Sequence, residues 1–231
     1  MRVVVIGVTG RIGKRVAKLL HQNGHEVVGL NRRAERVHIV FAGQPPFATH
    51  AVDALDAAAM ASHLATADAI VFATAPTREA PDEWLTQNLN ALAAAASGTR
   101  LVALSGSYAL TAPGGRPMLE ASPPNPYFLE LESVFSKQVA AYRAHAATAP
   151  VDSANGISAF DWLLIAPPPE TYPYGETTGD YRLAENQMVV TDPTSLNFKE
   201  TSKISMEDLA HFIVAQIEQP TLHETLVSIA Y

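Results

Sequence analysis

Three glycines near the amino terminus have the spacing of a phosphate-binding turn. They belong to a G-x-x-G-x-x-G run whose candidate ligands are Gly7, Thr9, Gly10, Arg11, Ile12 and Gly13. The first glycine permits a tight turn, the second lets the backbone approach a pyrophosphate, and the third lets strand and helix pack closely. Free N–H groups at the start of the following helix would complete an anion site. The run predicts dinucleotide binding, and a plain turn between strand and helix is the alternative.

A second candidate binding group follows the next apolar strand. Asn31, Arg32 and Arg33 stand there, and Arg36 follows a turn later. An NAD-selective site usually carries an acidic residue at this place for the ribose 2′-hydroxyl, and this chain has none. A guanidinium matches a 2′-phosphate in charge and geometry. We therefore expect NADP, with Arg32 as the main phosphate ligand and Arg33 assisting. NAD remains the alternative, with the arginines solvated on a surface loop.

Hydroxyl groups gather after a later apolar run, at 100–104. Ser105 and Ser107 follow this run and Tyr108 is adjacent, so these three are the candidate catalytic residues. The serines could orient a substrate oxygen by hydrogen bonding, and the tyrosine could supply a phenol or a stacking face. The alternatives are serines that cap the end of a strand and a tyrosine that only packs.

The elements that must position these groups alternate along the chain. The run at 2–6 is typical of a strand buried on both faces, and apolar residues at 12, 16, 19 and 20 predict a helix over 11–23. Further strands are expected at 26–30, 69–73, 100–104, 160–165 and 225–229, and further helices at 56–63, 83–96, 129–145 and 205–217, with Asp56 and Ser205 as helix caps. This alternation predicts an α/β fold, a Rossmann-like doubly wound parallel sheet with helices on both faces.

Two segments rich in glycine and proline interrupt the pattern, at about 105–127 and 166–200. Both are longer than ordinary connections, so we expect substrate-side loops, with a small C-terminal substrate lobe. No linker divides the sequence, which predicts a single domain over 1–231.

Composition narrows the class of partner. The chain has 231 residues, no cysteine and a formal net charge of -7, which argues against nucleic acid or an anionic membrane and favours a small molecule. No run approaches the length of a membrane-spanning helix and no signal peptide is visible, so a cytoplasmic location is expected. The eight histidines are dispersed, and we expect no metal. Monomer and homodimer both stay open.

Several motifs together resemble a known superfamily. The glycine run, the stretch 104–107, the loop 112–116 and the segments 176–183 and 204–210 occur in the order seen in bacterial NADH-flavin reductases and NAD(P)H-binding proteins. The chain thus resembles the atypical short-chain dehydrogenase/reductases. The resemblance implies an adenine site at Asp53 and Ala54, with a surface turn residue as the alternative for Asp53. The resemblance further implies a wall for the nicotinamide at Pro167. It also fits the expectation that a doubly wound sheet receives the ribose and nicotinamide at Ala73, Thr74 and Ala75.

One departure from the superfamily bears on chemistry. Its classical members use Tyr-x-x-x-Lys as the acid/base pair, and no tyrosine here has a lysine four residues later. Counting back from Lys137 gives Ser133. Hydride transfer to a flavin or quinone can proceed without a strong protein acid. We therefore expect an NADPH-dependent reductase with such a small acceptor, FMN or FAD being a substrate. The alternative is a non-catalytic NADP(H) sensor, and a sugar epimerase is the least favoured reading.

Overall fold

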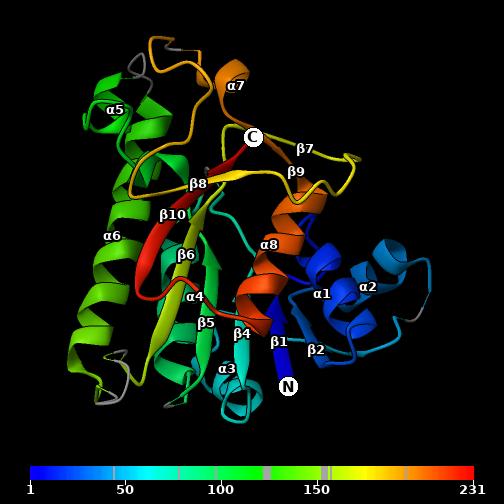
Figure 1. Ribbon diagram of the computed structural model, residues 1–231. Coiled ribbons are helices and arrows are strands. Elements are labelled where there is room, and N and C mark those ends of the chain that lie inside the picture. Colours follow the sequence, from blue (N-terminus) through cyan, green and yellow to red (C-terminus); the bar gives the residue numbers. More distant parts are fainter. Residues whose placement is uncertain are drawn as a thin grey trace.

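A computed structural model describes residues 1–43, 45–77, 79–96, 98–121, 126–151, 156, 158–195 and 197–231. Its centre is one large mixed sheet (Figure 1). The strands of this sheet are β1 (Arg2–Ile6), β2 (Glu26–Asn31), β3 (Ala48–Ala51), β4 (Ala69–Phe72), β5 (Arg100–Leu104), β6 (Asp161–Ala166), β8 (Arg182–Glu185) and β10 (Thr225–Ala230). A separate two-stranded sheet pairs β7 (Glu170–Tyr172) with β9 (Lys203–Ser205).

The strand order contains the switch point of a doubly wound sheet. The order is β3-β2-β1-β4-β5-β6-β10-β8, so the chain moves outward from β1 through β2 and β3 and then returns to β4 on the other side of β1. All pairs are parallel except β10 with β8, in which Val227 faces Glu185. In such sheets ligands bind outside the carboxyl ends of the strands, beside the switch point.

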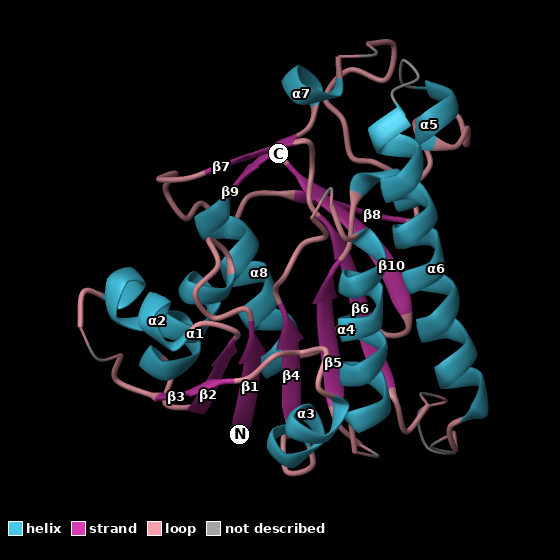
Figure 2. Ribbon diagram, turned by 180° about the vertical axis from the view of Figure 1, so that it is seen from behind, coloured by secondary structure: helices cyan, strands magenta, loops and turns pink. Residues whose placement is uncertain are grey.

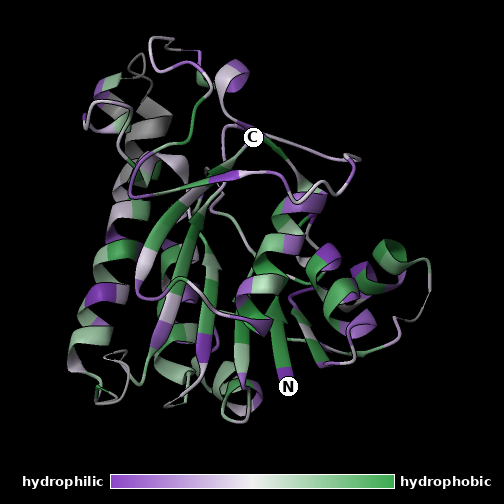
Figure 3. Cartoon of the chain, viewed as in Figure 1, coloured by the Kyte–Doolittle hydropathy of each residue, from purple (hydrophilic) through white to green (hydrophobic). Residues whose placement is uncertain are grey.

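Helices cover both faces of the sheet (Figure 2). They are α1 (Gly13–Gln22), α2 (Ala34–Phe41), α3 (Ala57–Leu64), α4 (Pro81–Ala94), α5 (Met118–Ala121), α6 (Pro126–Thr148), α7 (Phe198–Thr201) and α8 (Met206–Glu218). Side chains of α1 and α8 share one apolar core with the sheet, and side chains of α3, α4 and α6 share the other. In Figure 3 the inner strands are mostly hydrophobic, while β8 is largely hydrophilic.

The predicted doubly wound fold is confirmed, and each predicted helix or strand ends within three residues of its expected position. Two helix caps predicted from the sequence are present in the structure. The Asp56 carboxylate accepts a hydrogen bond from the Ala59 N–H at 3.0 Å and caps α3, and the Ser205 hydroxyl accepts one from the Asp208 N–H at 3.0 Å and caps α8. Such caps satisfy N–H groups that the helix itself leaves unpaired.

The structure differs from these expectations in two details. The sheet is not wholly parallel, because β8 pairs antiparallel to β10 as an edge strand. The segment 166–200 is not only loop, since it contains β7, β8 and the start of α7. Both short strands escaped notice because they are polar: only one face of an edge strand is buried, so no apolar run marks it. The segment 105–127 holds a 3-10 turn at Ser107–Ala109 and α5, and its residues 122–125 lie outside the described part.

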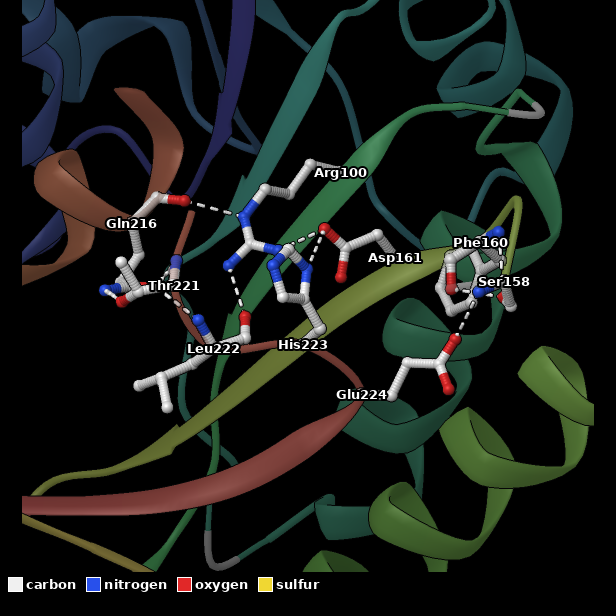
Figure 4. A network of polar contacts seen from close by, with 9 residues as sticks. All are labelled: Arg100, Ser158, Phe160, Asp161, Gln216, Thr221, Leu222, His223 and Glu224. Atoms are coloured by element: carbon white, nitrogen blue, oxygen red, sulfur yellow. Dashed lines mark hydrogen bonds and ion pairs between the residues drawn. The ribbon is translucent and has the colours of Figure 1, made fainter. Parts of the chain in front are cut away.

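A buried polar network ties the strands together at their amino ends (Figure 4). The Arg100 guanidinium donates to the Gln216 carbonyl at 2.6 Å and the Leu222 carbonyl at 2.9 Å, and it pairs with the Asp161 carboxylate. His223 Nδ1 lies 3.0 Å from the same carboxylate. Burial lowers the pKa of Arg100, and Asp161 opposes this effect. The network joins β5, β6, β10 and α8 at the amino ends of the strands. It therefore lies far from their carboxyl ends, beside which doubly wound sheets bind ligands.

Candidate functional site

A cavity of about 660 Å³ lies at the carboxyl ends of the central strands. It sits at the switch point between β1 and β4, as expected for this topology. The predicted cofactor residues that line it are Gly7, Thr9, Gly10, Arg11, Ile12, Asn31, Arg32, Arg33, Asp53, Ala54, Ala73, Thr74, Ala75 and Pro167. Gly13 does not line it but packs directly behind the loop. The fold thus brings residues from five separated segments to one hollow.

The glycine loop is too tight for side chains at two of its positions. Gly7 has φ 84°, and a Cβ there would lie 2.9 Å from the Ala73 carbonyl oxygen. A Cβ on Gly13 would lie 2.3 Å from the Gly7 carbonyl oxygen. In the part of the chain that the structure describes, no side chain caps the amino terminus of α1. That terminus is therefore open to an anion, which the aligned peptide dipoles of the helix favour.

Four arginines line the cavity in a protein whose net charge is -7. They are Arg11, Arg32, Arg33 and Arg36, and none of them has an ion-pair partner among the described residues. Asn31 is 7% exposed; its Oδ1 accepts a hydrogen bond from the Arg33 N–H at 2.9 Å, and its Nδ2 has no partner in the described part. Guanidinium groups and a free amide N–H are both donors that phosphate oxygens accept from.

The end of the cavity beside β2 and β3 is apolar with a polar border. Val52, Ala54 and Met60 supply apolar walls. Asp53 lines the cavity too, but its Oδ1 accepts a hydrogen bond from the Leu55 N–H at 3.0 Å, so it also holds the turn after β3. Apolar walls with polar groups at their border suit a purine base.

Helix α4 contributes residues that the sequence reasoning missed. Glu83, Trp84 and Gln87 line the cavity from this helix, and Asn90 donates to the Ala54 carbonyl oxygen at 2.9 Å, which fixes the helix against the turn after β3. Spacings of three and four residues on one helix face were the available signal. This spacing could not identify the site residues, because the sequence does not show which face of α4 lines the cavity.

The three candidate catalytic residues lie beside the cavity and not on its wall. Leu104 lines the cavity, and Ser105 follows it, 8% exposed, with an Oγ that has no partner in the described part. Ser107 and Tyr108 begin the 3-10 turn. Burial raises the pKa of Tyr108, so its phenol stays protonated at neutral pH.

Helix α6 offers no acid/base pair to the site within the described residues. Lys137 and Ser133 both lie on its exposed side, and the Lys137 ammonium is 3.8 Å from the Asp82 carboxylate. The buried side carries Phe135 and Gln138, and Gln138 Nε2 donates to the Leu104 carbonyl oxygen at 3.1 Å. This side also carries Tyr142, which is fully buried; its hydroxyl donates to the Asn88 Oδ1 at 3.3 Å, and burial raises its pKa. The described residues on the side of α6 that faces the sheet thus hold the strand end and α4 in place.

The segment after β7 is fastened to α8. The fully buried Asp208 carboxylate accepts hydrogen bonds from the Thr178 N–H at 2.9 Å, the Thr178 hydroxyl at 2.8 Å, the Gly179 N–H at 2.9 Å and the Tyr231 hydroxyl at 2.7 Å. Burial alone would raise the pKa of Asp208, but these hydrogen bonds outweigh it and hold the pKa below its ordinary value. Because Pro169 and Thr171 line the cavity, this anchoring supports one of its walls.

The comparisons with known proteins agree with this site. A family model described as NAD(P)H-binding matches residues 7–220. The chain belongs to this NAD(P)H-binding family. A nicotinamide dinucleotide is therefore its cofactor class, and the residues of the cavity fit one: an open helix terminus for the pyrophosphate and an apolar slot for the base. Among the described residues, no group of three or more His, Asp or Glu side chains could hold a metal ion.

Solved structures share the family fold at low sequence identity. A protein of Streptococcus pneumoniae named a putative NADH-flavin reductase has a TM-score of 0.75 and 20% identity, with 100% of this chain and 99% of that chain covered. A protein of Bacteroides thetaiotaomicron named a putative epimerase has a TM-score of 0.79 and 21% identity, covering 100% and 96%. A protein of Burkholderia pseudomallei named a putative exported protein has a TM-score of 0.76 and 21% identity, covering 100% of both chains. No curated protein matches the sequence.

Proposed function

We propose that this protein is an NADPH-dependent oxidoreductase that transfers a hydride to a small acceptor, a free flavin or a quinone. The observation that carries the cofactor preference is the group of four arginines in one cavity, without ion-pair partners among the described residues. NADPH brings the charges of a pyrophosphate and a 2′-phosphate, whereas NADH brings only the pyrophosphate. Charge and fork geometry both favour the phosphorylated cofactor.

The acceptor class follows from what the site lacks. The described residues of α6 offer no Tyr–Lys acid/base pair, and burial raises the pKa of Tyr108, which makes its phenol a weaker acid. A conjugated acceptor such as a flavin or quinone takes a hydride without a strong protein acid, because the charge it gains is delocalised and solvent can supply the proton. The protein then acts by bringing the nicotinamide and the acceptor together. The name of the Streptococcus pneumoniae structure fits this proposal.

The first experiment measures NADPH consumption by the purified protein with and without FMN, riboflavin and a simple quinone. Arg32→Ala is the test variant and Arg116→Ala is its control, because Arg116 is exposed, lies outside the cavity and causes the same change in charge. A charge-assisted hydrogen bond contributes about 1.5 to 3 kcal/mol, so Arg32→Ala should weaken NADPH roughly tenfold to a hundredfold and leave NADH unchanged. Equal losses for NADPH and NADH would refute the role of Arg32.

A non-catalytic NADP(H) sensor is the second candidate, favoured by the same lack of an acid/base pair. It predicts that NADPH binds but is not consumed with any acceptor. Among the described residues, no helix combines the length and apolar character needed to cross a bilayer. A cytoplasmic location remains our prediction, and one similar structure carries the name of an exported protein.

A further inference from the structure

Two polar side chains of α4 line the cavity and have no role in the hydride transfer proposed above. Glu83 is exposed and Gln87 is half-buried, and both belong to the cavity wall. Neither makes a side-chain hydrogen bond or an ion pair with another described residue. They lie four residues apart, so they are neighbours on one face of the helix. Their polar atoms are free to bind a ligand.

Asn90 shows which end of the cavity this helix face borders. Its amide donates to the Ala54 carbonyl oxygen at 2.9 Å and to the Leu55 carbonyl oxygen at 3.0 Å, in the turn after β3. Gln87 precedes Asn90 by one turn and Glu83 by two, so all three share a face and are about 4.5 Å and about 10.5 Å apart along the axis. The face therefore lies beside the apolar end of the cavity that Ala54 helps to form.

The donors and acceptors of this face match one edge of adenine. Adenine carries an amino group with two N–H donors, next to a ring nitrogen that accepts. The Gln87 amide can accept and donate, and the Glu83 carboxylate can only accept. Asp53, the residue predicted for adenine, already uses its Oδ1 to accept from the Leu55 N–H. A second carboxylate, on α4, leaves neither hydrogen of the amino group without an acceptor.

We propose that Glu83 and Gln87 bind the amino edge of adenine and make the cofactor site selective for adenine over oxopurines. This inference rests on the proposed cofactor, NADPH. In an oxopurine such as hypoxanthine an oxygen replaces the amino group, so this edge presents acceptors only. The Gln87 amide can turn and donate to that oxygen, whereas the Glu83 carboxylate has no proton to donate and repels it. Glu83 therefore supplies the selectivity, and Gln87 supplies affinity for both bases.

The test measures the Kd for NADP⁺ and for deamino-NADP⁺, which has hypoxanthine in place of adenine, by calorimetry. No hydride acceptor is present, so the result does not depend on turnover. The test variant is Glu83→Gln, because the amide has nearly the same shape and can donate to the hypoxanthine oxygen. Asp82→Asn is the matched control: it makes the same change from carboxylate to amide in the same first turn of α4, and Asp82 does not line the cavity.

The wild-type protein should bind NADP⁺ more tightly than deamino-NADP⁺. Glu83→Gln should weaken NADP⁺ and tighten deamino-NADP⁺, so that the ratio of the two Kd values falls about five- to tenfold. Gln87→Met should weaken both about three- to tenfold, the loss of one neutral hydrogen bond. Asp82→Asn should leave both Kd values unchanged.

Three results would overturn the proposal. The first is a wild-type protein that binds both dinucleotides equally. The second is a Glu83→Gln variant that keeps the wild-type ratio, whether its affinities are unchanged or equally reduced, since a structural role affects both ligands alike. The third is a Gln87→Met variant with unchanged affinities, because Gln87 would then make no contact with the base.

Adenosine 2′,5′-bisphosphate separates this proposal from the proposed function. It carries the base and the 2′-phosphate but no nicotinamide, so Glu83→Gln and Gln87→Met should weaken it by the same factor as NADP⁺. Variants that weaken NADP⁺ and leave the bisphosphate unchanged would place both residues at the nicotinamide and overturn the assignment to adenine. Failure of the wild-type protein to bind NADP⁺ at all would instead refute the proposed function.

Discussion

Replacing Asp208 by asparagine tests how the wall of the cavity is held. The wild-type carboxylate accepts four hydrogen bonds, two from backbone N–H groups and two from hydroxyls. The amide of Asp208→Asn is the same size but keeps only one oxygen. That oxygen can still accept from the Thr178 and Gly179 N–H groups, whereas the amide nitrogen must face the Thr178 and Tyr231 hydroxyls. The Tyr231 hydroxyl already accepts from the Ser205 N–H at 3.2 Å, so its proton loses its acceptor.

The magnitude follows from these four contacts. Hydrogen bonds to charged groups contribute about 1.5 to 3 kcal/mol, and neutral ones about 0.5 to 1.5 kcal/mol. Two bonds lose their charge assistance and two lose their acceptor, which suggests a loss of about 3 kcal/mol in the free energy of unfolding. The NADPH Kd should rise as well, because the released segment is continuous with the wall formed by Pro169 and Thr171.

The assay is urea denaturation at several pH values, with Asp180→Asn as the control, since Asp180 is an exposed aspartate of the same segment. The folded pKa of Asp208 lies below its unfolded value, so its contribution is complete above the unfolded pKa and disappears as the pH falls through the folded pKa. The difference between wild type and variant should therefore be constant near neutral pH and shrink below about pH 4. A variant within about 0.5 kcal/mol of wild type at pH 7 would refute this reasoning.

Three further predictions concern the loop, the network and the cofactor charge. Gly13→Ala should abolish NADPH binding in a fluorescence titration, because the added Cβ would meet the Gly7 carbonyl oxygen at 2.3 Å; binding within twofold of wild type would contradict it. Asp161→Asn should lower the free energy of unfolding by about 3 kcal/mol, since it leaves the buried Arg100 charge without its counterion, and an unchanged denaturation midpoint would argue against a structural ion pair. Raising salt from about 0.05 M to about 0.5 M should weaken NADPH more than NADH, and Arg32→Ala should reduce that difference; parallel salt curves for both cofactors would contradict the 2′-phosphate assignment.

Several features of the fold could be predicted because they depend on residues that are close together in the sequence. The glycine run predicted the tight loop, because Gly7 adopts a positive φ and Gly13 packs where no Cβ fits. The caps at Asp56 and Ser205 were visible because each acts on a residue three positions away. The central strands stood out as unbroken apolar runs, since a parallel sheet buries both of their faces.

The polar edge strand β8 could not be predicted, because its residues form no apolar run. The strand β8 carries Arg182 and Glu185 and pairs with β10, a partner far along the chain, so neither hydrophobicity nor local spacing marks it. The anchoring of the segment 178–182 depends on Asp208, 29 residues after Gly179, and on Tyr231, 49 residues after Arg182, and only close packing brings them together.

By itself the sequence determined the fold class, the tight glycine loop and the positions of the arginines after β2, because each depends on residues that are neighbours in the chain. The tertiary structure alone decided which residues of α4 face the cavity, that Ser133 and Lys137 face solvent, and that β8 pairs with β10. The physical reason is that the rotation of a helix and the register between strands are set by the packing of the whole core. No short stretch of sequence fixes either of them.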